Sequence, residues 1–332
     1  MYAIIDIGSN TIRMVLYKVI DNEIQQMLNS KIPAGLAGYI DNNNMLSKKG
    51  ILKAIEALSK FETILESVDV KEVHAFATAS LRNISNSEEV LAEIKKHCSF
   101  DIEIISGKEE ALYDYYGTMK SISSGNGLLV DVGGGSTELV YFENGTLLST
   151  CSIPVGSLNM YTNYVEDIIP TKSEIKNINN HVSEILNTLP LSSETINSTV
   201  LFGVGGSARA CCKLSDELFN ENSGYTGFEC KRLNKILKLA KKDKSKLVSA
   251  IIKATPGRIH TIIPGIAIIN SIAEHYGCTN FTVSPYGVRE GYLLNILEGK
   301  TFKPLHFTCR QNIHFGLTVS NALLPINIRS TR

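Results

Sequence analysis

Hydrophobic and polar positions follow two patterns along the chain, and these patterns predict its helices and strands. Apolar residues recur every three or four positions across 48–68 and 173–189, as they do in amphipathic helices. Short apolar runs bounded by turn residues are typical of strands. Such runs lie at 1–6, 12–16, 23–30, 73–77, 102–105, 128–131, 139–142, 146–151, 199–204 and 281–284. Because strands and helices alternate, the pattern predicts an α/β protein.

Serine and proline mark where helices begin or break. Ser47 precedes the helix at 48–68, and Ser87 precedes a segment that runs to about residue 96, so both are predicted helix caps. Further helices are predicted at 106–120, 258–276 and 289–297 and from residue 208. We expect an interruption at Pro264-Gly265, because proline removes a backbone donor and clashes with the preceding turn.

The stretch LLVDVGGGSTELVY, at 128–141, joins two predicted strands through a glycine turn. Without a Cβ, Gly133, Gly134 and Gly135 let the backbone approach a ligand and direct several N–H groups toward phosphate oxygens. Asp131 and Glu138 stand at the two ends of the turn, where carboxylates suit a hard cation held against the same oxygens. The stretch therefore predicts a phosphate-binding hairpin, although hairpins also use glycine for geometry alone.

The N-terminal stretch MYAIIDIGSNTIRMVLY, at 1–17, repeats the order of apolar run, acid, small-residue turn and second apolar run. Aligning the two stretches pairs Asp6 with Asp131, Gly8 with Gly133, Thr11 with Ser136, and Arg13 with Glu138. An internal repeat is informative about architecture. Two phosphate-type loops in one chain predict two related halves that face each other across a cleft.

Two other segments are candidates for ligand chemistry. SGKEEA, at 106–111, opens a predicted helix with Glu109 and Glu110 in its first turn. α/β proteins place ligands at such strand-to-helix edges, but first-turn acids also simply offset the helix dipole. Gly205-Gly206-Ser207 follows a predicted strand and could receive an anion at a helix N-terminus, although close strand-helix packing explains these glycines almost as well.

Residues 231–246, KRLNKILKLAKKDKSK, carry eight basic residues and one acid. A long polyphosphate would need such a surface. A solvated helix face with Leu233, Ile236 and Leu237 turned inward is the more usual meaning of a charge run.

Length and charge bound the organisation of the chain. Its 332 residues, 43% of them hydrophobic, are enough for two domains. We predict α/β domains at 1–122 and 123–299, joined near 121–126, and a tail at 300–332 without a clear period. Lys+Arg and Asp+Glu total 33 each. This balance argues against general binding to nucleic acid or membrane surfaces.

The apolar stretches and the cysteines indicate the cellular compartment of the protein. The longest apolar stretch, near 262–273, is too short to span a bilayer, and the N-terminus lacks the basic lead of a signal peptide. The seven cysteines are odd in number and show neither CxxC nor Cys/His ligand spacing. Such cysteines are typical of reduced thiols, so we expect a cytoplasmic protein.

Several segments, taken in order, resemble the successive motifs of the exopolyphosphatase and guanosine pentaphosphate phosphohydrolase family: AIIDIGSNTIRMVLY, ATASLR, EIISGKEEA, LLVDVGGGSTELVY, GVGGSARA, and RIHTIIPG followed by SPYGVREGYL. The match covers roughly 1–297, and ordered agreement is more specific than one glycine loop. The resemblance implies an actin-like ATPase (ribonuclease H-like) fold, with two α/β domains and the active site in the cleft between them. It also implies the short form of the family, which has two domains.

The resemblance further implies roles for individual residues. Glu110 falls at the position of the general base, Arg82 at a catalytic arginine, and Asp131, Glu138 and Glu110 at the metal-associated acids. The implied phosphate-binding residues are Asp6, Gly8, Ser9, Asn10, Thr11, Arg13, Gly133, Gly134, Gly135, Ser136, Thr137, Gly205, Gly206, Ser207 and Arg258. Ala34 and His260 stand where the family usually has Arg-Leu-Gly and Arg-x-Asp runs.

The implied reaction is hydrolysis of the terminal phosphoanhydride of inorganic polyphosphate or guanosine pentaphosphate by an activated water, with Mg²⁺, or alternatively Mn²⁺, as cofactor. We expect this substrate to be the partner, and we expect the protein to bind neither nucleic acid nor membranes. Formation of a homodimer stays open. Two other functions also stay open: a superfamily kinase or ATPase that uses ATP, and a non-enzymatic regulator that binds polyphosphate or a guanosine alarmone.

Overall fold

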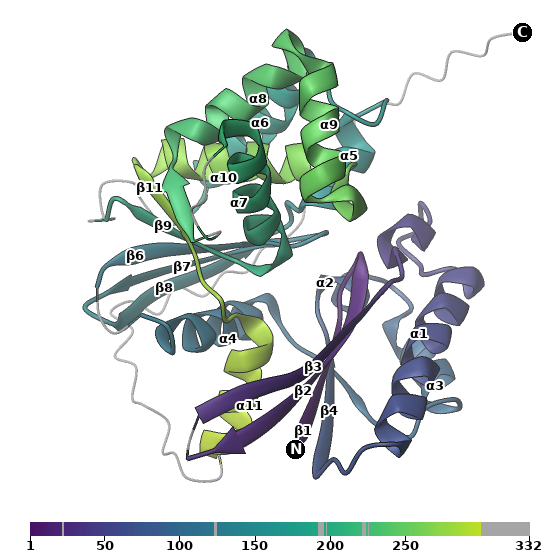
Figure 1. The fold of residues 1–332 in the computed structure, drawn as a ribbon. Coiled ribbons are helices and arrows are strands. Elements are labelled where there is room, and N and C mark those ends of the chain that lie inside the picture. The colour runs from purple at the N-terminus through teal and green to yellow at the C-terminus, as the bar shows by residue number, and fades with distance from the viewer. Residues whose placement is uncertain are drawn as a thin grey trace, which may run out of the picture. The chain divides into compact units, whose positions relative to one another are not determined.

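Two β-sheets and the helices around them make up the described part of the chain (Figure 1). The computed structural model describes residues 1–299 apart from 22, 123–124, 192–195, 197, 221–223 and 225. The predicted tail at 300–332 lies outside these residues. Among them, no helix is both long and apolar enough to cross a membrane.

The first sheet has the strand order β3-β2-β1-β4-β5. Its strands are β1 (Tyr2–Ile7), β2 (Thr11–Ile20), β3 (Glu23–Pro33), β4 (Glu72–Ala77) and β5 (Ile102–Ile104). β1 pairs antiparallel with β2 and parallel with β4. The predicted N-terminal hairpin is therefore β1 and β2, and β3 extends it.

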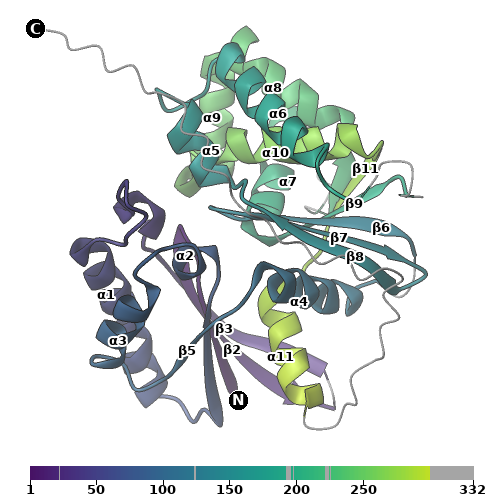
Figure 2. The ribbon, with the colours of Figure 1, turned by 180° about the vertical axis from the view of Figure 1, so that it is seen from behind.

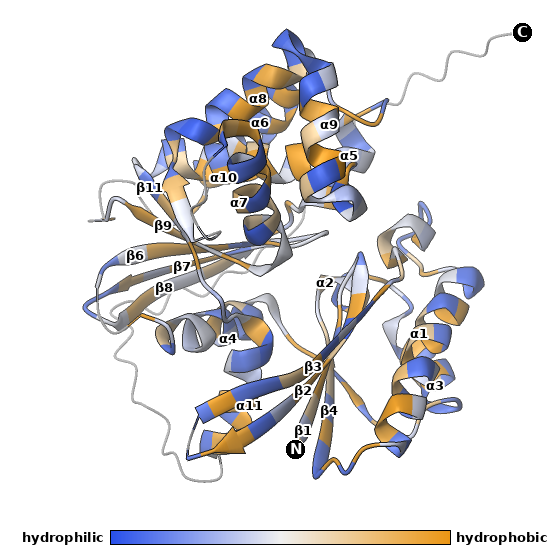
Figure 3. Cartoon of the chain, viewed as in Figure 1, coloured by the Kyte–Doolittle hydropathy of each residue, from blue (hydrophilic) through white to orange (hydrophobic). Residues whose placement is uncertain are grey.

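The second sheet has the strand order β10-β11-β9-β6-β7-β8. Its strands are β6 (Gly127–Val132), β7 (Thr137–Glu143), β8 (Thr146–Ile153), β9 (Val200–Val204), β10 (Gly227–Glu229) and β11 (Asn280–Val283). β6 pairs antiparallel with β7 and parallel with β9. Apart from the additional β10, this order reproduces that of the first sheet, with β6 in the place of β1. Figure 3 shows hydrophobic residues along the strands of both sheets.

The strand registers confirm the predicted internal repeat. Asp6 stands opposite Arg13 in the first hairpin, and Asp131 stands opposite Glu138 in the second. Both turns close with the same backbone bond: Gly8 N–H donates to the Thr11 carbonyl (3.2 Å), and Gly133 N–H donates to the Ser136 carbonyl (2.9 Å). The two hairpins are thus equivalent position by position, as the alignment predicts.

Helices α1 (Lys48–Glu66) and α3 (Ser87–Lys95) cover one face of the first sheet (Figure 1). The Ser47 hydroxyl accepts the Gly50 N–H at 3.4 Å and caps α1, as predicted. The predicted cap at Ser87 is wrong by one residue, because Asn86 occupies the cap position of α3. The Asn86 side chain instead accepts the N–H of Leu46, so tertiary contact takes precedence over local capping.

Helices α4 (Gly107–Met119) and α11 (Val288–Gly299) lie on the other face of the first sheet, side by side (Figures 1 and 2). Tyr292 of α11 packs on Phe76 of β4, with ring centroids 4.7 Å apart. α4 also contacts β7 and β8 of the second sheet. α11 thus completes the core of the first sheet although it belongs by sequence to the predicted domain 123–299. The boundary near residue 122 remains a prediction.

The second sheet carries its helices on the face away from α4 (Figure 1). They are α5 (Ser157–Tyr164), α6 (Lys172–Leu186), α7 (Gly205–Phe219), α8 (Lys231–Lys242), α9 (Lys244–Ala254) and α10 (Ile262–His275). The expected break at Pro264-Gly265 is wrong, since α10 runs through it. Pro264 is the third residue of α10, where its missing N–H has no acceptor within the helix.

The basic segment forms α8 and the start of α9. Leu233, Ile236 and Leu237 are buried, and Lys235 and Lys238 are exposed. The burial pattern agrees with a solvated helix face whose leucine and isoleucine side chains turn inward. Binding of polyphosphate there stays a prediction.

Candidate active site

The two glycine hairpin loops lie against each other and line one cavity of about 130 Å³. A Cβ added to Gly134 would stand 3.0 Å from the Cβ of Ser9, and one added to Gly135 would stand 3.4 Å from the Ser9 hydroxyl. A side chain at Gly134 or Gly135 would therefore contact Ser9 of the first loop. The predicted face-to-face arrangement of the loops is confirmed.

Most of the predicted site residues line this cavity: Asp6, Gly8, Ser9, Asn10, Thr11, Arg13, Glu110, Asp131, Gly133, Gly134, Gly135, Ser136, Gly205, Gly206 and Arg258. Four others lie behind the lining: Arg82, Thr137, Glu138 and Ser207. The hydroxyl of Thr137 donates to the Val155 carbonyl, and that of Ser207 donates to the Val132 carbonyl at 2.7 Å. These two side chains bond to the backbone beside the loops, and the Ser207 hydroxyl also accepts a hydrogen bond from Arg258 at 3.4 Å.

The segment after β3 supports the first loop through its backbone. The N–H groups of Ala34 and Gly35 both donate to the Asn10 carbonyl, at 3.1 and 2.9 Å, and Ala37 N–H donates to the Ser9 carbonyl at 3.1 Å. These bonds do not depend on side-chain identity, so Ala34 in this segment is compatible with the loop. The second departure, His260, packs its ring on Tyr161 with centroids 5.1 Å apart.

Glu109 and Glu110 have different structural roles in the first turn of α4. Glu109 forms a capping box, in which its carboxylate accepts the Ser106 N–H at 2.7 Å and the Ser106 hydroxyl accepts the Glu109 N–H at 3.2 Å. Glu110 turns toward the cleft, where Arg82 donates to its Oε2 at 2.9 Å. The helix-end explanation therefore accounts for Glu109 but not for Glu110.

Arg82 joins two of the buried acids. Besides its bond to Glu110, its Nη2 lies 3.8 Å from Oε1 of Glu138, which also accepts the Ser152 hydroxyl at 2.8 Å. Burial and then the charge of Glu138 raise the pKa of Glu110 well above its usual range, against the opposing effect of Arg82. Burial and then Asp131 raise the pKa of Glu138 to about 7.

Asp131 lies against the start of α7. A Cβ on Gly205 would stand 2.3 Å from Asp131 Oδ1, and the φ of Gly205 is +77°, a conformation that other residues rarely adopt. Both facts require glycine there. The predicted third glycine turn thus allows Asp131 its position, and α7 begins directly at Gly205.

Five arginines surround the cleft. Arg289 donates to Asp6 Oδ2 at 2.7 Å, and Arg82 holds Glu110. Arg13, Arg209 and Arg258 line the cavity and form no ion pair among the described residues.

Burial lowers the pKa of all three of these unpaired arginines. Arg289 and Arg209 add to the effect on Arg13, whose pKa falls to about 10. Even this value leaves Arg13 protonated at neutral pH. Unpaired, partly desolvated guanidinium groups that repel one another provide a site for an anion with several oxygens.

Sequence reasoning missed two of the five arginines, Arg209 and Arg289. Both lie inside segments that carried the family resemblance, GVGGSARA and SPYGVREGYL. Their helices, α7 and α11, bring them to the cleft from positions distant from Asp6 in sequence. The single arginine in each of these two motifs was the available signal.

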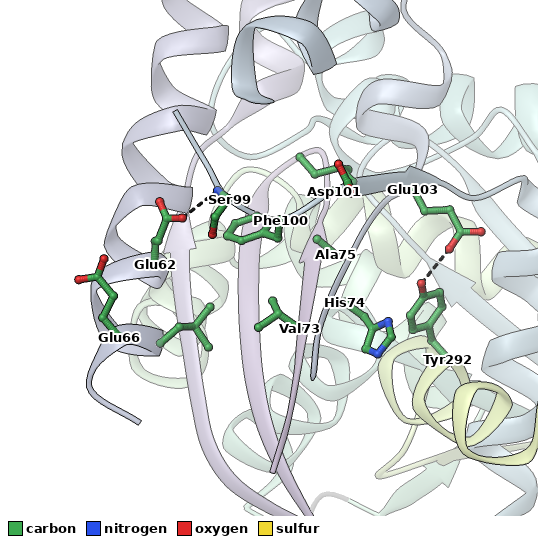
Figure 4. A pocket seen from close by; sticks show the side chains of 12 residues that line it. Glu62, Glu66, Val73, His74, Ala75, Ser99, Phe100, Asp101, Glu103 and Tyr292 are labelled. Carbon is green, nitrogen blue, oxygen red and sulfur yellow. Dashed lines mark hydrogen bonds between the residues drawn. The ribbon is translucent and has the colours of Figure 1, made fainter. Parts of the chain in front are cut away.

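A larger cavity, of about 840 Å³, lies on the first sheet beside α1, β4, β5 and α11 (Figure 4). Its lining includes Glu62, Glu66, Asp101 and Glu103, and the described residues that line it include no lysine or arginine. An acidic wall repels a phosphate chain. The smaller cavity between the loops is therefore the candidate active site.

The acids of the cleft fit a hard divalent cation. Among the described residues no three Asp, Glu, His or Cys side chains converge into a ready-made metal cage. Mg²⁺ is usually held by one or two carboxylates together with substrate phosphates and water. Asp131 and Glu138 are directly opposite each other; Glu138 is buried and Asp131 is half-buried, and desolvation raises the pKa of both. Asp131 forms no ion pair among the described residues, although Arg209, Arg289 and Arg258 oppose the rise of its pKa. The pair offers the oxygen ligands that Mg²⁺ prefers.

Two sheets of matching topology, with paired phosphate-type loops at a shared cleft, define the actin-like ATPase class of α/β fold. Solved structures agree. The exopolyphosphatase of Cytophaga hutchinsonii aligns with a TM-score of 0.77 and 23% identity, over 90% of this chain and 98% of that one. The Aquifex aeolicus member of the Ppx/GppA protein family aligns with a TM-score of 0.73 and 24% identity, over 91% and 99%.

The model of the Ppx/GppA phosphatase family matches residues 15–300, and the chain belongs to this family. A Haemophilus influenzae protein whose name assigns it provisionally to the exopolyphosphatases is 24% identical over 89% of this chain and 90% of its own length. The guanosine-5'-triphosphate,3'-diphosphate pyrophosphatase of Vibrio atlanticus is 28% identical over 90% of this chain, which spans only 59% of that protein.

Proposed function

We propose that the protein hydrolyses the terminal phosphoanhydride of inorganic polyphosphate or guanosine pentaphosphate by attack of an activated water. One observation carries the proposal: two equivalent phosphate-type loops meet at a cavity that holds unpaired arginines beside buried acids. Names of relatives point to the same two substrates. Phosphoryl transfer passes through a loose transition state, so positioning and electrostatic stabilisation dominate catalysis.

In this proposal the arginines and both glycine loops bind the substrate. Arg13, Arg209 and Arg258 neutralise the terminal phosphate groups, and the N–H groups of both glycine loops donate to their oxygens. Because Arg289 is already paired with Asp6, it stiffens the first loop and has less charge to offer an anion. The substrate end is thus held in one orientation before reaction.

Glu110 is the proposed general base. It lines the cavity, it is buried, and Arg82 fixes its Oε2, which leaves Oε1 to accept a hydrogen bond from water. A raised pKa makes its carboxylate a stronger proton acceptor once ionised. Glu110 would orient the water in line with the anhydride bond and accept its proton.

Asp131 and Glu138 would hold the cation, Mg²⁺ or Mn²⁺. When bound, a divalent cation neutralises charge on the transferred phosphoryl group and on the adjacent acids. Ser152 and Arg82 fix the orientation of Glu138, and Gly205 fixes that of Asp131. We also propose a cytoplasmic location, where the six described cysteines, all free thiols, would stay reduced.

Release of phosphate from polyphosphate, guanosine pentaphosphate and ATP, each with Mg²⁺ and with a chelator, tests the proposal. We expect Mg²⁺-dependent release from at least one of the first two and little from ATP. Release from ATP alone, or phosphorylation of an acceptor by ATP, would identify a kinase or ATPase. Tight binding of polyphosphate without release from any substrate would identify a non-enzymatic regulator.

A further inference from the structure

Asp114 is a buried acid that the proposed mechanism does not use. It lies on α4 one turn after Glu110, so the two side chains project from the same face of the helix. Its exposed fraction is 0%, and neither carboxylate oxygen has a hydrogen-bond partner among the described residues. Buried polar groups are nearly always hydrogen-bonded, so a carboxylate with two unmet oxygens needs a specific explanation.

The surroundings of Asp114 are mostly negative. Three acids act on it from three elements: Asp131 from β6, Glu110 from α4 and Glu138 from β7. The positive group that acts on it is Arg289 of α11, which already pairs with Asp6. Burial and then Asp131 raise the pKa of Asp114 well above its usual range. The protein alone therefore does not compensate this carboxylate.

Asp114 lies directly behind the lining of the cavity. A Cβ on Gly287, which lines the cavity, would stand 3.3 Å from Asp114 Oδ1. α4 packs closely at the same point, because a Cβ on Gly117 would stand 2.3 Å from the Gly287 carbonyl oxygen. The carboxylate is thus fully buried behind the cavity wall, where the charges of Asp131 and Glu138 act on it.

We propose that Asp114 belongs to the divalent-cation site at Asp131 and strengthens cation binding there, because the cation is the positive partner that its buried carboxylate lacks. This inference rests on the proposed function, which places the cation at Asp131 and Glu138. Asp114 does not touch the reacting atoms, so it is a positioning residue. Carboxylates behind the direct ligands commonly contribute 10- to 100-fold, roughly, to metal affinity.

Binding of Mn²⁺ alone, without substrate, tests the inference in the full-length chain. The fraction of free Mn²⁺ is measured by electron paramagnetic resonance for the wild type, Asp114→Asn and Asp131→Asn. Asp114→Asn keeps the shape of the side chain and removes its charge. We expect it to raise the Kd for Mn²⁺ about tenfold or more. We also expect it to raise the melting temperature of the chelator-treated protein, because it removes an uncompensated buried acid.

Thr118→Val is the matched control. Thr118 lies one turn further along α4, its exposed fraction is 0%, and its hydroxyl likewise has no partner among the described residues, but it carries no charge. We expect Thr118→Val to leave the Kd for Mn²⁺ within about twofold of the wild type. Mn²⁺ should raise the melting temperature of Asp114→Asn less than that of the wild type. In Thr118→Val, Mn²⁺ should raise the melting temperature as much as in the wild type.

Three results would overturn the inference. An unchanged Kd in Asp114→Asn, with weakened binding in Asp131→Asn, would reject the role of Asp114 and leave the proposed cation site standing. Equal weakening by Thr118→Val would show that packing of α4, and not charge, matters. Absence of Mn²⁺ binding by the wild type would remove both the inference and the proposed cation site.

Discussion

The first and second hairpin loops have equivalent backbones but opposite charge on the returning strand. Each begins at an aspartate, closes with one bond between equivalent residues, and stands beside the same cavity. At the position where β2 presents Arg13, β7 presents Glu138. Arg289 neutralises Asp6 in the first loop, but Asp131 in the second has no ion-pair partner among the described residues.

This difference assigns complementary tasks to the two loops. A neutralised aspartate beside a free arginine favours an anion, and two adjacent acids favour a cation and a proton acceptor nearby. In the proposed mechanism, both loops bind phosphate through the same backbone geometry, and the exchange of Arg13 for Glu138 on the returning strand gives them different roles. The following predictions test this division.

The largest expected effect is that of Glu110→Gln. It removes the proposed proton acceptor and keeps the hydrogen bond to Arg82 geometrically feasible, so kcat should fall about 10²- to 10⁴-fold. Binding of polyphosphate should be retained, because Arg13, Arg209 and Arg258 are intact. Steady-state phosphate release and equilibrium binding measure the two quantities. Near-normal turnover would remove Glu110 from the mechanism.

Gly205→Ala should lower kcat about 10²-fold, because its Cβ would displace Asp131 from a position 2.3 Å away. Gly145→Ala is the matched control: Gly145 also has a positive φ, +67°, but nothing lies within 4 Å of an added Cβ. Both variants should lose about 1 to 2 kcal/mol of unfolding free energy from backbone strain. Equal activities in the two variants would contradict a role for Gly205 in seating Asp131.

Arg13→Gln should raise KM for polyphosphate about 10- to 100-fold, the range for losing a hydrogen bond to a charged group. Its Mn²⁺ affinity should stay close to that of the wild type, because Arg13 belongs to the anion-binding loop. Glu138→Gln should show the opposite pattern, with weakened Mn²⁺ binding. Initial-rate kinetics and metal titration of both variants check the contrast. If both substitutions changed metal affinity alike, the division of tasks would be wrong.

The smallest effect expected is on stability as a function of pH. The pKa of Glu138 rises from 4.5 to about 7 on folding, so the unfolded chain releases this proton at lower pH than the folded protein. Melting temperature of the metal-free protein should therefore decline as pH rises from about 5 to about 7. Calorimetry in chelator measures this, and Glu138→Gln should flatten the slope. A rise in melting temperature over this interval would contradict the assignment.

Much of the fold follows from the sequence because local pattern and global topology agree. The β1–β2 and β6–β7 hairpins, their residue pairing and the cap at Ser47 depend on neighbours along the chain. The two predictions that failed, the cap at Ser87 and the break at Pro264, depend on details that a pattern does not contain. One is a tertiary bond to Leu46, and the other is a proline placed within the first helical turn.

The candidate site was predictable in its loops and less so in its arginines. The glycines and acids of the hairpins can be identified in the sequence, because their spacing is repeated. Arg289 reaches Asp6 only because α11 packs on the first sheet, 283 positions along the chain. Asp114 likewise looks like an ordinary helix residue until burial and the absence of a described partner distinguish it.

The most direct test of the division between the loops is a crystal structure of Glu110→Gln with a short polyphosphate and Mg²⁺. We expect the terminal phosphate between residues 8–13 and 133–136, in contact with Arg13, and the cation on Asp131. A polyphosphate bound only along α8, or a cation seated at Asp6 in place of Asp131, would contradict it.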